Sequence, residues 1–189
     1  MNEHKVYLPS KANFSEYTLF LDRDGVINKP RVADYAKIPE EFELIDGALE
    51  AIQVFNNLFQ KVIIVTNQQG IHRGLMSETD LENVHLKLYN ALKEKGIDYP
   101  EAVFFAPYLN SEQHNWRKPK VGMPTMAQTY FPTINLKKSI MVGDSDGDMT
   151  LADNMGSIKV KILNPQFNFN NQDLEFSSLW QFAEHLTKM

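Results

Sequence analysis

The architecture of this chain follows from one nonapeptide, FLDRDGVIN, at residues 20–28. The apolar residues 17–21 predict a short buried strand, and the strand ends in two carboxylates, Asp22 and Asp24. Alternation along an extended chain points both side chains to the same side, and Gly25 then allows the backbone to turn sharply. Two like charges this close repel each other unless a cation or a shared proton offsets them, so we expect a divalent ion such as Mg²⁺ here. The competing interpretation is an acidic turn that only caps a helix.

Bulk composition limits the function classes. The chain has 189 residues, a formal net charge of −5 and no cysteine. We expect one domain at residues 17–189 after an N-terminal extension at residues 1–16. The acidic charge gives no electrostatic footprint for nucleic acid, and the lack of thiols excludes disulfides and thiolate metal sites. Without a secretory signal or a membrane-spanning run, the sequence predicts a cytoplasmic protein, and we expect a monomer.

Apolar runs alternate with amphipathic segments along the whole chain. Strands are expected at residues 17–21, 61–65, 102–106, 139–142 and 157–163. Helices are expected at residues 46–58, 77–95, 124–130, 148–155 and 174–186. The second strand is apolar and β-branched throughout, which is typical of a parallel sheet covered on both faces. This pattern predicts an α/β fold, a three-layer α/β/α sandwich around a central parallel sheet.

Polar side chains gather where the predicted strands end. Thr66 follows the second strand, Asp144 and Asp148 follow the fourth, and Lys118 lies in the connection before it. In open α/β sheets ligands bind outside the carboxyl ends of the strands. Several carboxylates with one lysine and one hydroxyl suit phosphoryl transfer through bound magnesium. One carboxylate can attack phosphorus, and a second, two residues on, can protonate the leaving oxygen and later deprotonate water.

The polar segment 29–42 follows the first motif directly. It is either a plain surface loop or a flap that brings Arg31 and Tyr35 over the site, because binding groups favour such loops.

Taken together, the four segments resemble the four motifs of the haloacid dehalogenase-like (HAD) phosphatase superfamily. The matching residues are, in order, Asp22-x-Asp24-Gly25, Thr66, Lys118 and Gly143-Asp144-x-x-x-Asp148. The resemblance implies a Rossmann-like HAD fold in which Asp22 is the nucleophile and Asp24 the general acid/base. It implies Mg²⁺ held by Asp22, the Asp24 backbone carbonyl and Asp144, with the phosphoryl group bound by Thr66 and Lys118. Asp148 would support Lys118 or a metal-bound water.

The flanking sequence resembles the HAD subfamily of heptose 1,7-bisphosphate and histidinol-phosphate phosphatases, which lack a large cap domain. The segments concerned are DRDGVIN, TNQQGIHRG and RKPKVGM. This resemblance implies substrate contacts from Arg31, Asn67, Gln68, Gln69 and Arg117. Arg117 suits a second phosphate, because a guanidinium forms bidentate contacts with phosphate oxygens.

One feature of that subfamily is missing. Its members usually carry a zinc loop with a Cys-x-His and a Cys-x-Cys pair, where this chain has Ala106, Tyr108, His114 and Trp116. No zinc is expected, because one histidine without thiolates cannot complete a tetrahedral site. We expect Tyr108 and Trp116 to pack together and hold the loop by apolar burial.

The sequence therefore predicts a magnesium-dependent phosphomonoesterase that acts on a small phosphorylated metabolite, a sugar bisphosphate in the leading hypothesis. Histidinol phosphate is one alternative. A 3′-phosphatase on nucleic-acid ends is another, because TNQQGIHRG also resembles polynucleotide kinase phosphatase domains, although the acidic charge opposes it. A non-catalytic phosphate-binding module is the alternative from a different class.

Overall fold

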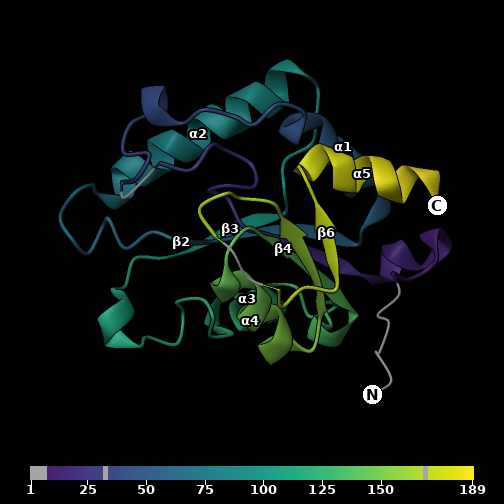
Figure 1. Ribbon diagram of the computed structural model, residues 1–189. Helices are drawn as coiled ribbons and strands as arrows, with labels where there is room; N and C mark the ends of the chain where they lie inside the picture. The colour runs from purple at the N-terminus through teal and green to yellow at the C-terminus, as the bar shows by residue number, and fades with distance from the viewer. Residues whose placement is uncertain (1–7, 32–33, 168–169) are drawn as a thin grey trace.

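The computed structural model describes residues 8–31, 34–167 and 170–189. Within them, six strands form one sheet in the order β3-β2-β1-β4-β5-β6, with every neighbouring pair parallel (Figure 1). The strands are β1 (Thr18–Leu21), β2 (Lys61–Asn67), β3 (Ala102–Ala106), β4 (Ser139–Gly143), β5 (Ile158–Ile162) and β6 (Leu174–Phe176). The strand that carries the nonapeptide, β1, lies at the centre between β2 and β4, and all four of its residues are buried.

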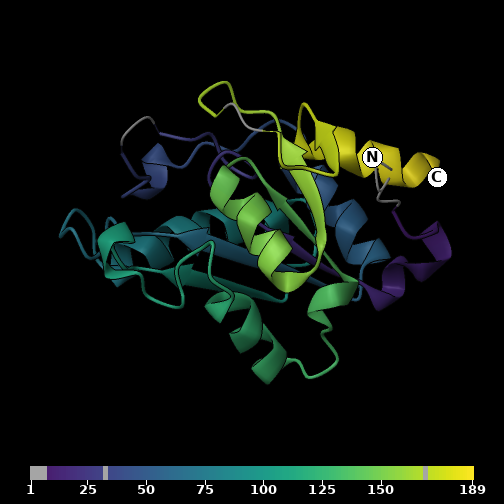
Figure 2. The same ribbon diagram turned by 60° about the horizontal axis from the view of Figure 1, so that its bottom comes forward.

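Helices cover both faces of the sheet, so the predicted three-layer sandwich is confirmed (Figures 1 and 2). One face packs against α1 (Ala48–Leu58), α2 (Glu78–Glu94) and α5 (Leu179–Lys188), and the other against α3 (Gly122–Tyr130) and α4 (Asp146–Met155). Alternate residues of β1 serve the two layers: Leu19 and Leu21 belong to one hydrophobic cluster, and Phe20 to the other. This is the period-two arrangement of a strand buried on both sides.

The predicted C-terminal helix at residues 174–186 is wrong at its start. Leu174 and Phe176 lie in β6, which pairs with Val160 and Ile162 of β5. The helix begins only after Ser178, whose side chain accepts a hydrogen bond from the backbone N–H of Gln181. Apolar residues two apart followed by a serine N-cap are the sequence signal for this strand and helix start.

The described part of the N-terminal segment packs onto the sandwich. Residues Lys11–Glu16 form a 3₁₀ helix, and Phe14 within it is fully buried against Phe59 with ring centroids 5.2 Å apart. Residues 1–7 of the predicted extension lie outside the described residues.

The connection from β1 to α1 stays close to the sheet edge. It holds a 3₁₀ turn at Pro39–Glu41 and an isolated bridge between Asn28 and Leu44, and its described residues form no separate cap domain. In the described ranges no helix has the length and apolar character needed to cross a membrane.

Candidate active site

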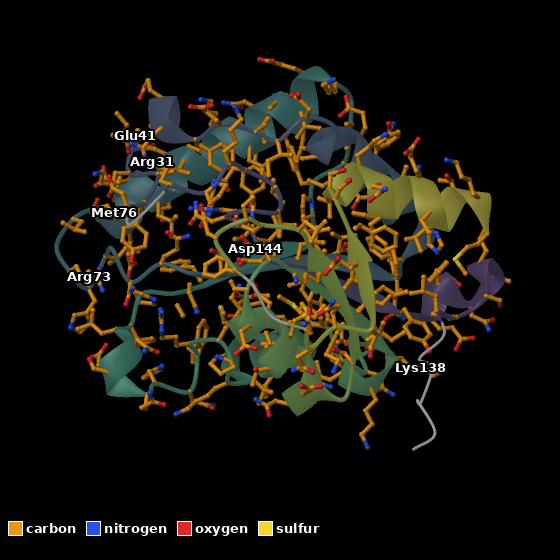
Figure 3. All side chains as sticks on the ribbon, viewed as in Figure 1. Arg31, Glu41, Arg73, Met76, Lys138 and Asp144 are labelled. Atoms are coloured by element: carbon orange, nitrogen blue, oxygen red, sulfur yellow. The ribbon has the colours of Figure 1, made fainter. Side chains whose placement is uncertain are left out.

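A pocket of about 280 Å³ opens at the carboxyl ends of β1, β2 and β4. Its lining includes Asp22, Asp24, Arg31, Tyr35, Thr66, Asn67, Lys118 and Asp144. The sheet edge therefore brings together all four catalytic candidates, Asp22, Asp24, Thr66 and Lys118, and the remaining predicted metal ligand, Asp144. Figure 3 shows Asp144 near the centre of the molecule, with Arg31 and Glu41 on the segment that borders the pocket.

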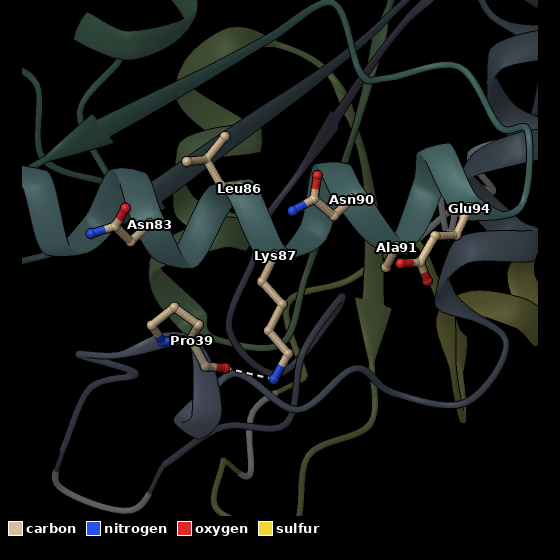
Figure 4. Close-up of a pocket in the computed structure, with 7 residues that line it drawn as sticks. All are labelled: Pro39, Asn83, Leu86, Lys87, Asn90, Ala91 and Glu94. Atoms are coloured by element: carbon tan, nitrogen blue, oxygen red, sulfur yellow. Dashed lines mark hydrogen bonds between the residues drawn. The ribbon is translucent and has the colours of Figure 1, made fainter.

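A larger hollow of about 490 Å³ lies on the outer side of α2 and has a different character. Figure 4 shows it between α2 and Pro39, where Lys87 donates to the Pro39 carbonyl at 2.5 Å. Its lining contains one carboxylate, Glu94, and no cluster of titratable groups. The smaller pocket is therefore the candidate active site.

The three carboxylates Asp22, Asp144 and Asp148 form a tight acidic cluster, with one oxygen of each within 4.8 Å of the others. Lys118 Nζ lies 2.7 Å from Asp22 Oδ1 and 2.7 Å from Asp148 Oδ1. Burial and the neighbouring Asp148 raise the pKa of Asp22 well above its ordinary value, although Lys118 acts in the opposite direction. The two carboxylates raise the pKa of Lys118 despite its burial, so it stays charged.

Asp144 carries the clearest sign of excess negative charge. Burial and the nearby Asp148 raise its pKa to about 7, while a hydrogen bond from Asn164 Nδ2 to Asp144 Oδ2, 2.6 Å long, opposes that shift. Asp148 is held differently: its second oxygen accepts from Ser145 Oγ at 2.5 Å, which leaves both of its oxygens engaged. Among the described residues, Asp22 Oδ2 and Asp144 Oδ1 have no hydrogen-bond partner.

These two oxygens fit a hard divalent cation. Clustered carboxylates with raised pKa values repel one another, and a cation between them removes that repulsion. The acidic cluster could therefore hold a metal ion, with Asp22 and Asp144 supplying oxygens and Asp148 engaged with Lys118.

Asp24 lies in the opposite environment, among hydrogen-bond donors. Both of its oxygens accept from Arg23 at 2.9 Å, and single bonds come from Asn28 Nδ2 at 2.9 Å and Gln68 Nε2 at 2.8 Å. Burial acts to raise the pKa of Asp24, but Arg23 and the amide donors outweigh it, so the pKa lies below its ordinary value. This carboxylate is held in the ionised form and in one orientation.

The residues after β2 hold the site together from one side. Asn67 accepts from the Lys118 backbone N–H at 3.0 Å and donates to the Lys118 carbonyl at 3.2 Å. Gln68 donates to Thr66 Oγ1 at 2.9 Å as well as to Asp24, and it is fully buried. The amide NH2 of Gln68 is thus engaged by the site's own side chains, while its Oε1 has no hydrogen-bond partner among the described residues, and its predicted contact with substrate stays a prediction.

Two glycines are required by close approach. Gly25 has a φ of 85°, a conformation that side chains disfavour, and a Cβ there would overlap the Asp144 carboxylate. A Cβ on Gly143 would overlap Asp148 in the same way. Gly25 therefore lets the loop after β1 approach Asp144, and Gly143 lets Asp148 of α4 lie against the end of β4.

Of the remaining residues predicted to bind substrate, some line the pocket and others do not. Arg31 lines the pocket and pairs with Glu41 at 3.5 Å. Arg117 donates to the Tyr108 carbonyl at 3.2 Å, and neither it nor Gln69 lines the pocket. Arg117 is half-buried beside Tyr35, and burial lowers its pKa.

The loop at residues 107–116 is held by rings, but not by the predicted pair. Tyr108 stacks on His114 with centroids 3.4 Å apart, and Trp116 packs edge-on against Phe104 at 6.4 Å. The expected Tyr108–Trp116 pairing is wrong, because among the described residues no ring contact joins the two, although both rings pack against the same hydrophobic cluster.

Three residues that support this site escaped the sequence analysis. Arg23 and Asn164 hold Asp24 and Asp144, and His85 on α2 contacts Arg23 through its Nε2 at 3.2 Å. The available signal for His85 was its position on the apolar stripe of α2 with Leu81 and Leu88, where a polar residue needs a partner.

Comparison with known proteins places these features in a family. Residues 18–183 match the protein family described as polynucleotide kinase 3 phosphatase. A D-glycero-alpha-D-manno-heptose-1,7-bisphosphate 7-phosphatase of Mycobacterium bovis is 34% identical over 172 residues, covering 89% of this chain and 90% of that protein. A D-glycero-beta-D-manno-heptose-1,7-bisphosphate 7-phosphatase of Helicobacter pylori is 36% identical over 132 residues, covering 69% and 74%.

Solved structures agree with these relatives. The D,D-heptose 1,7-bisphosphate phosphatase of B. bronchiseptica, complexed with magnesium and phosphate, superposes with a TM-score of 0.81 at 28% identity. The match covers 91% of this chain and 98% of that one. The enzyme of the same name from Burkholderia thailandensis gives a TM-score of 0.65 at 25% identity, covering 92% and 99%.

Proposed function

The chain belongs to the polynucleotide kinase 3 phosphatase family and is a HAD-type phosphatase, and we propose that it hydrolyses a sugar bisphosphate with the help of Mg²⁺. The proposal rests on the contrast between two neighbouring carboxylates. Asp22 belongs to an acidic cluster that Lys118 bridges, whereas Asp24 is held by hydrogen-bond donors. Two carboxylates in opposite surroundings are suited to two different tasks in one reaction.

In the first step, one Asp22 oxygen attacks the phosphorus atom of the substrate. The bond from phosphorus to the sugar oxygen breaks as the aspartyl phosphate forms, and Asp24 gives its proton to the departing oxygen. The donors around Asp24 favour its ionised form, so protonation before this step depends on the substrate. A phosphate group brought next to Asp24 raises its pKa, because like charges disfavour the ionised carboxylate.

In the second step, Asp24 removes a proton from water. The water oxygen attacks phosphorus, the bond to Asp22 breaks, and inorganic phosphate leaves. The contacts from Arg23, Asn28 and Gln68 hold the Asp24 carboxylate in place to act as the base.

Lys118 and Thr66 would hold the transferring phosphoryl group, and Lys118 would offset its charge. We propose that Asp22, Asp144 and the backbone carbonyl of Asp24 hold Mg²⁺, while Asp148 fixes Lys118. When bound, the ion offsets the charge that the carboxylates and the phosphoryl group share. We propose that no zinc is needed, because the loop at residues 107–116 is held by ring contacts.

The substrate class follows from the relatives and from the cations near the pocket. The similar proteins act, by their names, on heptose 1,7-bisphosphates of both anomers. A bisphosphate needs a second cationic contact, and Arg31 is the arginine that lines the pocket in the described residues. Arg117 would serve this role only after exchanging its contact with the Tyr108 carbonyl.

The family description supports one second candidate, a 3′-phosphatase on nucleic-acid ends. The net charge of −5 opposes it, because such substrates are bound mainly through their phosphates.

The test is release of inorganic phosphate from both heptose 1,7-bisphosphate anomers, histidinol phosphate and a 3′-phosphorylated oligonucleotide, with Mg²⁺ and with EDTA. We expect the highest kcat/KM for one of the bisphosphates, and none for any substrate in EDTA. Preference for either of the other two would overturn the substrate and keep the mechanism. No turnover by a protein that still binds Mg²⁺ would indicate a binding module.

A further inference from the structure

Arg23 is a charged side chain with no access to solvent. It is fully buried, and its guanidinium lies 5.7 Å from the centre of the Phe42 ring. A buried charge needs a partner, and Arg23 NH2 finds one in both oxygens of Asp24 at 2.9 Å. Its Nε has no hydrogen-bond partner among the described residues. Besides Asp24, the polar contact that can orient the guanidinium is therefore the one made by NH1.

That contact is His85, which α2 presents from the helical layer. Arg23 NH1 lies 3.2 Å from His85 Nε2. A guanidinium can only donate, so Nε2 must accept and the ring proton must lie on Nδ1. Burial and the charge of Arg23 lower the pKa of His85 to about 3, which keeps the ring neutral.

We propose that His85 is a positioning residue for the phosphatase reaction, holding the Arg23 guanidinium that in turn holds the Asp24 carboxyl. The inference rests on the proposed role of Asp24 as general acid/base. Asn28 and Gln68 each give Asp24 one hydrogen bond, whereas Arg23 spans both oxygens. Without an acceptor, NH1 would be left unpaired in a buried space, and Arg23 would shift towards another partner or admit water. Asp24 would move with it.

Displacement of Asp24 should slow the reaction more for substrates whose leaving group needs a proton than for those whose leaving group does not. Phenyl phosphate has a leaving group of pKa about 10 and needs a proton when the bond to phosphorus breaks, whereas p-nitrophenolate leaves as a stable anion. Because kcat/KM covers only the steps up to the aspartyl phosphate, the ratio between these two substrates reports on the acid. A general loosening of the fold would lower both values together.

The experiment compares two variants of His85. His85→Leu removes the acceptor at similar volume, and we expect kcat/KM to fall about 10-fold or more for phenyl phosphate but less than about threefold for p-nitrophenyl phosphate. His85→Gln places an amide oxygen near the former Nε2, and we expect both values within about threefold of wild type. His185→Leu, at an exposed histidine on α5, is the matched control and should leave the ratio unchanged.

Equal losses on both substrates, no loss in His85→Leu, or a His85→Gln variant as impaired as His85→Leu would each overturn the proposal. Nitrogen NMR of the wild type gives a readout without turnover: we expect an unprotonated Nε2 at neutral pH, and a protonated Nε2 would overturn the contact. A wild-type protein that hydrolyses neither aryl phosphate nor heptose bisphosphate contradicts the proposed function instead.

Discussion

Asp22 and Asp24 are one residue apart, yet the structure places them in opposite surroundings. Asp22 lies among two further carboxylates and shares Lys118 with one of them, and its pKa is raised. Asp24 lies among a guanidinium and two amides, and its pKa is lowered. The spacing of the motif sets only the direction of the two side chains. Their different chemistry comes from residues that other strands and loops bring to them.

The two regions also differ in whether the chain's own residues balance their charge. The Asp22 region has more negative charge than Lys118 can offset, so a proton or a bound cation has to balance the remainder. The Asp24 region is complete in itself, since every donor that orients the carboxylate belongs to the chain. Four experiments test this contrast.

The first compares the two aspartates directly. Asp22→Asn should lower turnover about 10⁴-fold or more, because it removes the nucleophile. Asp24→Asn should lower steady turnover by about 10²–10⁴-fold, because it removes proton transfer. With p-nitrophenyl phosphate, Asp24→Asn should still give a burst of p-nitrophenolate in rapid mixing, and Asp22→Asn should give none. A burst from Asp22→Asn would reverse the assignment of the two residues.

The second experiment removes Lys118, the positively charged side chain within the acidic cluster. Lys118→Met leaves two buried carboxylates without their partner, and we expect the free energy of unfolding to fall by about 3–5 kcal/mol in urea at pH 7.5 without metal. Lys138→Met, at an exposed pair with Glu16, should change it by less than about 0.5 kcal/mol. A Lys118→Met protein as stable as wild type would show that the cluster is protonated at this pH.

The third experiment uses pH to separate what the Asp22 region and the Asp24 region each contribute to stability. Asp144, with a pKa near 7, binds a proton in the folded state that the unfolded chain has released, so metal-free stability should fall as pH rises from about 4 to 7. Asp24, whose pKa is lowered, has the opposite effect on the free energy of unfolding. Its ionised carboxylate stabilises the folded state above about pH 4, and this stabilisation is lost as the pH falls below that value.

Mg²⁺ at about 100 times its Kd should restore about 2.7 kcal/mol at pH 7.5 and less at pH 5, where protons compete for the same oxygens. Thermal unfolding with Mg²⁺ and with EDTA at both pH values measures this. An equal effect at both pH values would contradict a carboxylate site.

The fourth alters the support of one predicted metal ligand. Asn164→Ala removes the bond to Asp144 Oδ2, and we expect Mg²⁺ affinity measured by titration calorimetry to fall about 10- to 100-fold. Asn171→Ala, whose side chain bonds Asp153 on the surface, should leave the affinity unchanged. Unchanged affinity in Asn164→Ala would mean that Asp144 needs no such support.

Much of the fold and the centre of the site could be predicted from local patterns. Apolar runs located β1 to β5, and polar residues at their carboxyl ends located Asp22, Thr66 and Asp144. This works because parallel strands present their carboxyl ends at one edge.

The supporting contacts could not be predicted, because they join distant elements. Arg23 counts only as a spacer in a motif of two aspartates, and its burial depends on Phe42 and His85. Asn164 follows β5 and bonds to Asp144, which follows the neighbouring strand β4. Pairing of β6 depends on β5 beside it, so the short run at residues 174–176 was merged with the helix that follows.

The contact between Gly25 and Asp144 bears on how this architecture can diversify. A side chain at position 25 would collide with the carboxylate, so the tips of β1 and β4 have no room for substitution and must change together. The segment that begins at Lys29 is different, because its ends are pinned by a hydrogen bond from Lys29 N to the Glu43 carbonyl at 2.8 Å. Residues inserted between those two points leave the strand tips undisturbed. New substrate preferences in this scaffold should therefore arise by lengthening that segment, while the chemistry at the strand tips is inherited intact.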